Sequence, residues 1–204
     1  MVNLLCTHKI SQLRVAKDVG LLIPHSIVTT QKKCILKHSK LYEKVIVKSV
    51  SNMTILNNSS DVISHRLFSY EELLKLSDFT HPCIIQQFIE KEFEIRVFFI
   101  GEKLYSAALF FENNTLFPDY KDLLNYSDIA IIPFKLPYTI EVKIKKFMKK
   151  LNLNIGCIDL IKTRAGDYYF LEVNHSGQFS NISVQCNYFL EQKIAYKLIR
   201  NKVK

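Results

Sequence analysis

The chain has 204 residues, of which 48% are hydrophobic and 12% aromatic, so it can bury one sizeable core or two small lobes. No apolar run approaches the roughly 20 residues that a membrane span requires, and the first nine residues lack the features of a signal peptide. The formal charge of +9 attracts polyanions. These features exclude a membrane segment and predict a cytoplasmic protein.

Cysteine and lysine positions exclude two further classes. The five cysteines are scattered, with no Cys-x-x-Cys or Cys/His cluster, so we expect reduced thiols rather than zinc ligands. Lysines between Lys143 and Lys150 are interspersed with Ile140, Ile144 and Phe147, which recur at the three- to four-residue spacing of one helix face. This pattern is typical of a solvated lysine face over a buried stripe, and it argues against nucleic-acid recognition.

The N-terminal part of the chain predicts a small α+β lobe. In chain order its expected elements are a helix over residues 9–19 closed by Gly20, a strand over 26–30, a helix over 31–42 and a strand over 44–50. An asparagine-rich loop at 51–60, a strand over 61–68 and a short helix over 71–76 follow.

The remaining part predicts strands with helices between them. The expected elements are strands over residues 83–89, 93–100 and 104–111, an irregular connection over 112–137, a helix beginning near 140, strands over 155–160 and 168–174, and a final helix over 188–202. We predict lobes at residues 1–85 and 86–204.

Three oxygen-bearing side chains lie on the last two predicted strands. Glu172 and Asn174 are two residues apart, so they point to one face, and a hairpin partner can bring Asp159 beside them. Hard oxygen donors of this kind hold Mg²⁺, which substrate phosphates usually complete. The alternative is a polar sheet face in which carboxylates alternate with lysines.

Two cations lie on strands from which they can reach a phosphate. Lys48 ends a strand before a loop, and Arg96 lies between Ile95 and Val97. The alternative for Lys48 is a solvent-facing lysine on an edge strand. The alternative for Arg96 is an ion pair with Glu94 or Glu92.

The order of these motifs resembles the ATP-grasp ligases, in particular the peptide maturases that make graspetides, the microviridin-type and grasp-with-spasm enzymes. The resemblance runs from about Ile10 to Ile199. Its specific segments are Gln86-Gln87-Phe88-Ile89 followed by Glu94-Ile95-Arg96-Val97, Asp119-Tyr120-Lys121, and Leu171 to Phe179 continuing through Cys186-Asn187-Tyr188.

The resemblance implies an α+β ATP-grasp fold whose two lobes hold ATP between them, with Mg²⁺ as the metal. It implies that a carboxylate of an acidic precursor peptide becomes an acyl phosphate, which an amine or hydroxyl then attacks to form a crosslink. The implied roles are Lys48 at the nucleotide phosphates, Gln86, Gln87, Phe88 and Ile89 at the adenine, Glu94 at the ribose, Arg96 and Lys121 at the reacting groups, and Asp159, Glu172 and Asn174 as metal ligands.

The sequence departs from the family pattern at several positions. The family usually has Glu at Gln87, Arg at Lys121 and Pro at His175, and a lysine loses the bidentate fork of an arginine. The chain begins where the central lobe of these enzymes begins, without the N-terminal domain of about a hundred residues. Three interpretations stay open: a truncated enzyme, a fragment, or one half of a split enzyme, whose partner would be a separate N-terminal-domain chain or a second copy in a homodimer.

Two other functions fit the same residues. One is an ATP-grasp amino-acid ligase of the glutamate-adding type. The other is a nucleotide-binding partner subunit without catalytic activity. An acidic, Thr-rich peptide encoded beside this chain would favour crosslinking.

Overall fold

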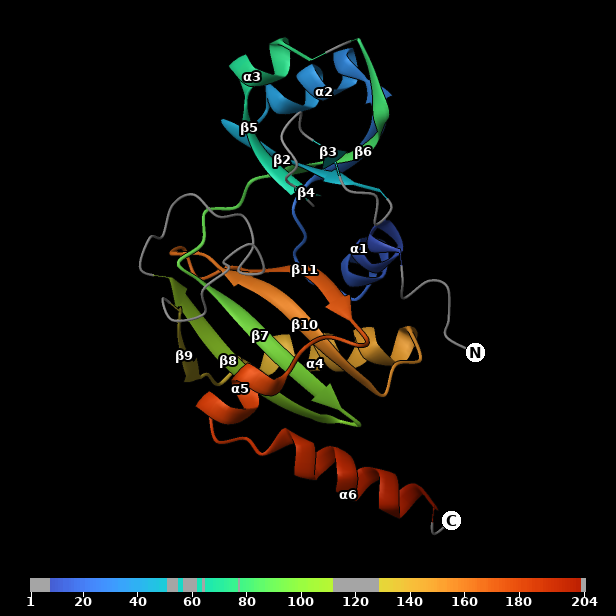
Figure 1. Cartoon of the computed structure of the whole chain (residues 1–204), viewed down its shortest axis with the longest axis vertical. Helices are drawn as coiled ribbons and strands as arrows, with labels where there is room; N and C mark the ends of the chain where they lie inside the picture. Colours follow the sequence, from blue (N-terminus) through green and yellow to red (C-terminus); the bar gives the residue numbers. More distant parts are fainter. Residues whose placement is uncertain are drawn as a thin grey trace. The chain divides into compact units, whose positions relative to one another are not determined.

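The computed structural model contains both helices and strands, and it describes residues 8–50, 55–56, 62–63, 65–76, 78–111 and 129–202. They form two compact units (Figure 1). Of the described residues, the larger unit contains 8–23, 91–111 and 129–202, and the smaller unit contains those between 24 and 90. No helix among the described residues is long and apolar enough to cross a membrane.

The smaller unit is built on a four-stranded antiparallel sheet with the order β1-β6-β2-β5. Its elements are β1 (Ser26–Gln31), α2 (Lys32–Ser39), β2 (Lys44–Ser49), β5 (His65–Ser69), α3 (Tyr70–Leu74) and β6 (Phe79–Gln87), with β3 (Ile55–Leu56) and β4 (Val62–Ile63) paired separately. Alternate residues of β2 and β6, such as Val45 and Ile85, pack on Ile35 and Leu73 of the helices. The opposite sheet face carries Lys48.

The larger unit contains a five-stranded antiparallel sheet with the order β11-β10-β7-β8-β9. Its elements are α1 (Lys9–Asp18), β7 (Phe93–Ile100), β8 (Lys103–Phe111), β9 (Ile129–Pro133), α4 (Tyr138–Lys150), β10 (Ile155–Lys162), β11 (Tyr168–Asn174), α5 (Ser180–Gln185) and α6 (Leu190–Lys202). This mixture of helices with two antiparallel sheets is the α+β class that the sequence predicts.

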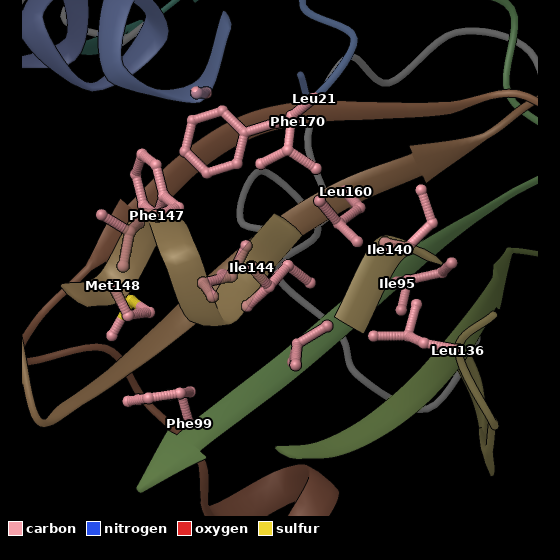
Figure 2. Close-up of a cluster of buried hydrophobic side chains, with 14 of the residues drawn as sticks. Leu21, Ile95, Phe99, Leu136, Ile140, Ile144, Phe147, Met148, Leu160 and Phe170 are labelled. Atoms are coloured by element: carbon pink, nitrogen blue, oxygen red, sulfur yellow. The ribbon is translucent and has the colours of Figure 1, made fainter. Parts of the chain in front are cut away.

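One face of the larger sheet packs on α1 and α4 and forms the main hydrophobic core. Ile95 and Leu160 from the strands meet Ile144 and Phe147 of α4 (Figure 2). The rings of Phe147 and Phe170 lie 4.7 Å apart, centroid to centroid. The exposed positions of α4 include Lys145, Lys146, Lys149 and Lys150, which confirms the predicted lysine face.

The other face of the sheet is also covered around β7, in which every residue is buried. The ring of Phe179, which follows β11, lies 5.0 Å from that of Phe98. The ring of Tyr188 lies 5.6 Å from that of Tyr105. A central strand that is covered on both faces gives Arg96 a buried environment.

Several predicted bounds differ from the structure, and helix α5 is absent from the sequence prediction. Strand β6 begins at Phe79 and ends at Gln87, so Phe88 and Ile89 follow the strand instead of lying within it. The connection over residues 112–137 is not irregular throughout, because residues 129–133 form β9, whose Ile129 and Ile131 point inward. The lobes at residues 1–85 and 86–204 stay a prediction; helix α1 packs with the larger sheet.

We predict that Phe147→Ala lowers the free energy of unfolding by about 3–5 kcal/mol, because it empties a fully enclosed site in the core. Urea unfolding measures the change. The matched control is Lys146→Ala, an exposed change on the same helix that should stay within about 0.5 kcal/mol of the unmodified protein. Equal effects of the two changes would contradict the assigned core.

Candidate functional site

Arg96, Asp159 and Glu172 form a row across three neighbouring strands. In the register of the sheet, Asp159 of β10 lies opposite Arg96 of β7 on one side and opposite Glu172 of β11 on the other. Directly opposed residues of antiparallel strands place their side chains on the same face. The row lies on the face away from α4, since the adjacent residues Ile158 and Val173 pack into the core.

A β-bulge in β11 sets the direction of Glu172. Glu172 lies opposite Asp159 and Phe170 lies opposite Leu160, so Leu171 is an extra residue on β11. The extra residue allows Phe170 and Val173 both to enter the core, while Glu172 and Asn174 face the site. The predicted alignment of Asp159, Glu172 and Asn174 on one face is therefore present.

Arg96 is held from two sides in a buried position. Its guanidinium forms an ion pair with the Asp159 carboxylate, and its Nη2 donates a hydrogen bond to the Gln178 carbonyl oxygen at 2.9 Å. Arg96 is 3% exposed and Asp159 is 7% exposed. Such charges are expensive to bury unless they are paired and hydrogen-bonded, so these contacts anchor the arginine.

The ion pair of Arg96 with Asp159 differs from the predicted alternative, which named Glu94 or Glu92 as the partner. Glu94 is buried and forms an ion pair with Lys91 at 2.5 Å. Glu92 forms an ion pair with Lys162. Each of these glutamates therefore has a lysine as its cation, and the arginine forms its ion pair with Asp159.

The turn after β11 folds back onto Arg96. Asn174 is the first residue of the turn. Its side-chain Oδ1 accepts a hydrogen bond from the Ser176 N–H at 3.1 Å, and its backbone carbonyl accepts one from the Gly177 N–H at 3.2 Å. A Cβ at Gly177 would lie 2.8 Å from Arg96 Nη2 and 2.8 Å from Cys157 Cβ. Only glycine lets the backbone approach closely enough for Gln178 to reach the arginine.

Helix α1 supplies two side chains to β11 that the sequence did not identify. Lys9 Nζ lies 3.3 Å from Glu172 Oε2. Gln12 Nε2 donates to the Val173 carbonyl at 3.0 Å, and Gln12 Oε1 accepts from the Val173 N–H at 2.9 Å. Gln12 could have been identified from the sequence as a polar residue that lies with the apolar Leu13 and Ala16 on the buried side of the helix.

The smaller unit carries the residues predicted to bind the nucleotide. Lys48 is half-buried and shares a sheet face with Ile46, Ile84 and Gln86, opposite the core beneath the helices. The Gln86 side chain is buried and donates to Ser26 Oγ at 3.0 Å. This side-chain bond ties β6 to β1.

The segment after β6 is tied to the smaller unit by its backbone. The Gln87 N–H donates to the His25 carbonyl at 2.8 Å, and the Phe88 N–H donates to the Lys44 carbonyl at 3.3 Å. Ile89 is buried. These bonds hold residues 86–89 in an extended course. Asp119 and Lys121 lie outside the described residues.

The donor chemistry of the predicted metal ligands fits Mg²⁺. Two carboxylates and one amide oxygen are the hard donors that this ion prefers. Each of the three side chains has a partner within the protein. Asp159 forms an ion pair with Arg96, Glu172 forms an ion pair with Lys9, and Asn174 accepts a hydrogen bond from the Ser176 N–H. Within the described part of the chain, no group of three or more His, Cys, Asp or Glu side chains could form a different metal site.

Solved structures share this fold. Macrocyclase MdnC of Microcystis aeruginosa MRC, bound with precursor peptide MdnA, is 27% identical with a TM-score of 0.70, over 88% of this chain and 56% of MdnC. A RiPP-associated ATP-grasp ligase of Chryseobacterium gregarium, in complex with ADP and a leader and core peptide, is 24% identical with a TM-score of 0.75, over 87% of this chain and 54% of that one.

A third structure, the ATP-grasp ligase PsnB with a variant of its minimal precursor, Mg and ADP, is 17% identical with a TM-score of 0.67, over 88% of this chain and 54% of PsnB. The chain thus spans little more than half the length of these ligases. No protein-family model matches the sequence, and comparison with curated proteins finds no match.

The two antiparallel sheets with their helices and the similarity over most of the chain lead to one conclusion. The chain has the ATP-grasp fold, and its predicted resemblance to the ATP-grasp ligases of ribosomal precursor peptides is confirmed in structure.

Proposed function

We propose that this chain is the nucleotide- and metal-binding part of an ATP-dependent ligase that crosslinks an acidic precursor peptide. The terminal phosphoryl group of ATP is transferred to a peptide carboxylate, releasing ADP. An amine or hydroxyl of the peptide then attacks the acyl carbon and displaces phosphate. The observation that carries the proposal is the row of Arg96, Asp159 and Glu172 across β7, β10 and β11.

The similar structures support the proposed ligands. The Chryseobacterium ligase was solved with ADP and with a leader and core peptide, and PsnB with Mg and ADP. The net charge of +9 suits both a nucleotide and an acidic peptide, because it raises the local concentration of anions. A fold of this kind also serves other substrates, so the site residues must support the assignment.

Arg96 is proposed to stabilise the negative charge of the transferring phosphoryl group. Its guanidinium is fixed by Asp159 and by the Gln178 carbonyl before any ligand arrives. A cation that is already oriented needs little reorganisation during the reaction, and burial strengthens its interaction with a nearby anion. This fixed orientation supports a role for Arg96 at phosphate oxygens.

Asp159, Glu172 and Asn174 are proposed to hold Mg²⁺. When bound, this ion neutralises phosphate charge and orients the transferring group. The residues themselves supply oxygen donors from a rigid pair of strands. Arg96 and Lys9, which now contact the two carboxylates, keep those charges balanced in the unliganded chain.

The smaller unit is proposed to bind the nucleotide. Lys48 would contact its phosphates, Gln86 to Ile89 would pack on and hydrogen-bond the adenine, and Glu94 of the larger unit would approach the ribose. Lys121 is proposed to face the peptide. Support comes from the position of Lys48, which lies half-buried beside the apolar Ile46 and Ile84 on one face of the sheet.

The first test of the proposal is whether the chain binds a nucleotide. Calorimetric titration with a non-hydrolysable ATP analogue, with and without Mg²⁺, tests the nucleotide site. We expect magnesium-dependent binding. A folded chain that binds no nucleotide would contradict the proposed nucleotide site.

We predict that Glu172→Gln lowers ATP turnover at least a hundredfold, because the exchange keeps the volume and removes a metal-binding charge. ADP release in the presence of candidate acidic peptides measures turnover, and circular dichroism checks the fold. Glu102→Gln, the same exchange at an exposed turn of the larger unit, is the control and should leave turnover unchanged. Normal turnover in Glu172→Gln would remove the residue from the site.

We predict that Lys48→Ala weakens binding of the ATP analogue about tenfold or more, since it removes a charged contact to phosphate. The dissociation constant from calorimetry measures the effect. Lys44→Ala provides the control because Lys44 lies on the same strand and face but is exposed at its far end. If both variants bind the analogue equally well, Lys48 does not contact the phosphates.

A further inference from the structure

Gln12 occupies an unusual position for an amide side chain. It lies in the second turn of α1, is 3% exposed, and is far in sequence from the strand that it contacts. Its Oε1 and Nε2 bond respectively to the N–H and C=O of a single residue, Val173. The side chain therefore pairs with the β11 backbone as a neighbouring strand would.

This contact lies at the open edge of the sheet. Strand β11 is the outermost strand and pairs with β10 on one side only. The polar groups of Val173 that Gln12 binds point away from β10, in a buried environment. Leaving a buried donor or acceptor unsatisfied costs about 1–3 kcal/mol for each group. Gln12 removes this cost at one position on the edge.

A second contact closes the same edge three residues earlier. The Phe170 N–H donates to the Leu22 carbonyl at 2.8 Å, and Leu22 forms a parallel bridge with Tyr169. The two edge contacts, at Phe170 and Val173, bracket the bulge that contains Leu171 and Glu172. A bulge is an irregular point at which a strand can bend or shift. The contacts on both sides hold it in one conformation.

Val173 is also the residue between Glu172 and Asn174. Fixing its N–H and C=O fixes the two peptide planes to which those residues are attached, and hence the directions of their side chains. Lys9, one helical turn before Gln12, contacts the Glu172 carboxylate. Two residues of one face of α1 thus contact adjacent residues of β11.

We propose that Gln12 is a positioning residue for the metal-binding segment Glu172-Val173-Asn174. The inference rests on the proposed function, since it assigns to Gln12 the support of that site. Only a glutamine side chain is both long enough to reach Val173 and able to donate and accept a hydrogen bond there. Met has the length without the polar atoms, and Asn has the polar atoms on a shorter side chain. Partners of this indirect kind commonly change metal affinity by about 10- to 100-fold.

The test measures binding of Mn²⁺, a spectroscopic substitute for Mg²⁺, by electron paramagnetic resonance in the presence of the ATP analogue. We expect Gln12→Met to raise the dissociation constant for Mn²⁺ about tenfold. The matched control is Leu13→Ala, which removes core packing from the next residue of α1 and should lower stability without changing Mn²⁺ affinity more than about twofold.

A second readout follows the contact itself. Hydrogen exchange of the Val173 amide should become faster in Gln12→Met than in Leu13→Ala at matched stability, because only the first variant removes its acceptor. Gln12→Asn keeps the amide but shortens the side chain, so it should also raise the dissociation constant for Mn²⁺ and speed hydrogen exchange of the Val173 amide. This variant replaces Gln12→Met in the test if Gln12→Met does not fold.

The outcomes separate the inference from the function on which it rests. Normal Mn²⁺ affinity in folded Gln12→Met or Gln12→Asn, with the unmodified protein binding Mn²⁺, would overturn the positioning role and leave the site intact. An equal loss in Leu13→Ala would also overturn it, because the effect would then follow stability. Absence of Mn²⁺ binding in the unmodified protein with the analogue would overturn the proposed metal site itself.

Discussion

The buried ion pair between Arg96 and Asp159 is the contact on which the rest of the site depends. Burying two charges carries a desolvation penalty that only good geometry and further hydrogen bonds can offset. The Gln178 carbonyl supplies one such bond, and Gly177 allows the backbone to approach closely enough to form it. The turn after β11, the central strand β7 and the strand β10 are thereby joined at one point, and removing either charge would break a buried ion pair.

The edge of the sheet shows a different solution to a similar problem. Strand β11 carries two proposed metal ligands, yet it has a neighbouring strand on one side only. Helix α1 and the segment at Leu22 bond to the backbone on the open side. An edge strand that is closed in this way is protected from pairing with another chain, and its irregular bulge is kept in one conformation. Rigid support of this kind is what a binding site requires of the residues behind its ligands.

Much of the fold was predictable because it follows from local patterns. The alternation in residues 93–100 predicts a strand with the observed bounds, and Gly20, with a φ of 83°, ends the first helix as expected. The helical spacing of Ile140, Ile144 and Phe147 was sufficient to identify the buried stripe of α4. The errors fell where local signals are weak: β9 is short and follows a long connection, and the apolar Phe88-Ile89 pair reads as strand although the ladder ends at Gln87.

For the candidate site, sequence spacing alone placed Glu172 and Asn174 on one face, because side chains alternate along any strand. It also identified Arg96 and Asp159 as unusual polar residues among apolar ones. The partners of these residues depended on the tertiary structure. Strand order decided that Arg96 lies beside Asp159 and pairs with it, and helix packing brought Lys9 and Gln12 to β11. The reason is physical: side-chain direction is a property of the local backbone, whereas a contact between residues more than sixty positions apart exists only after the chain has folded.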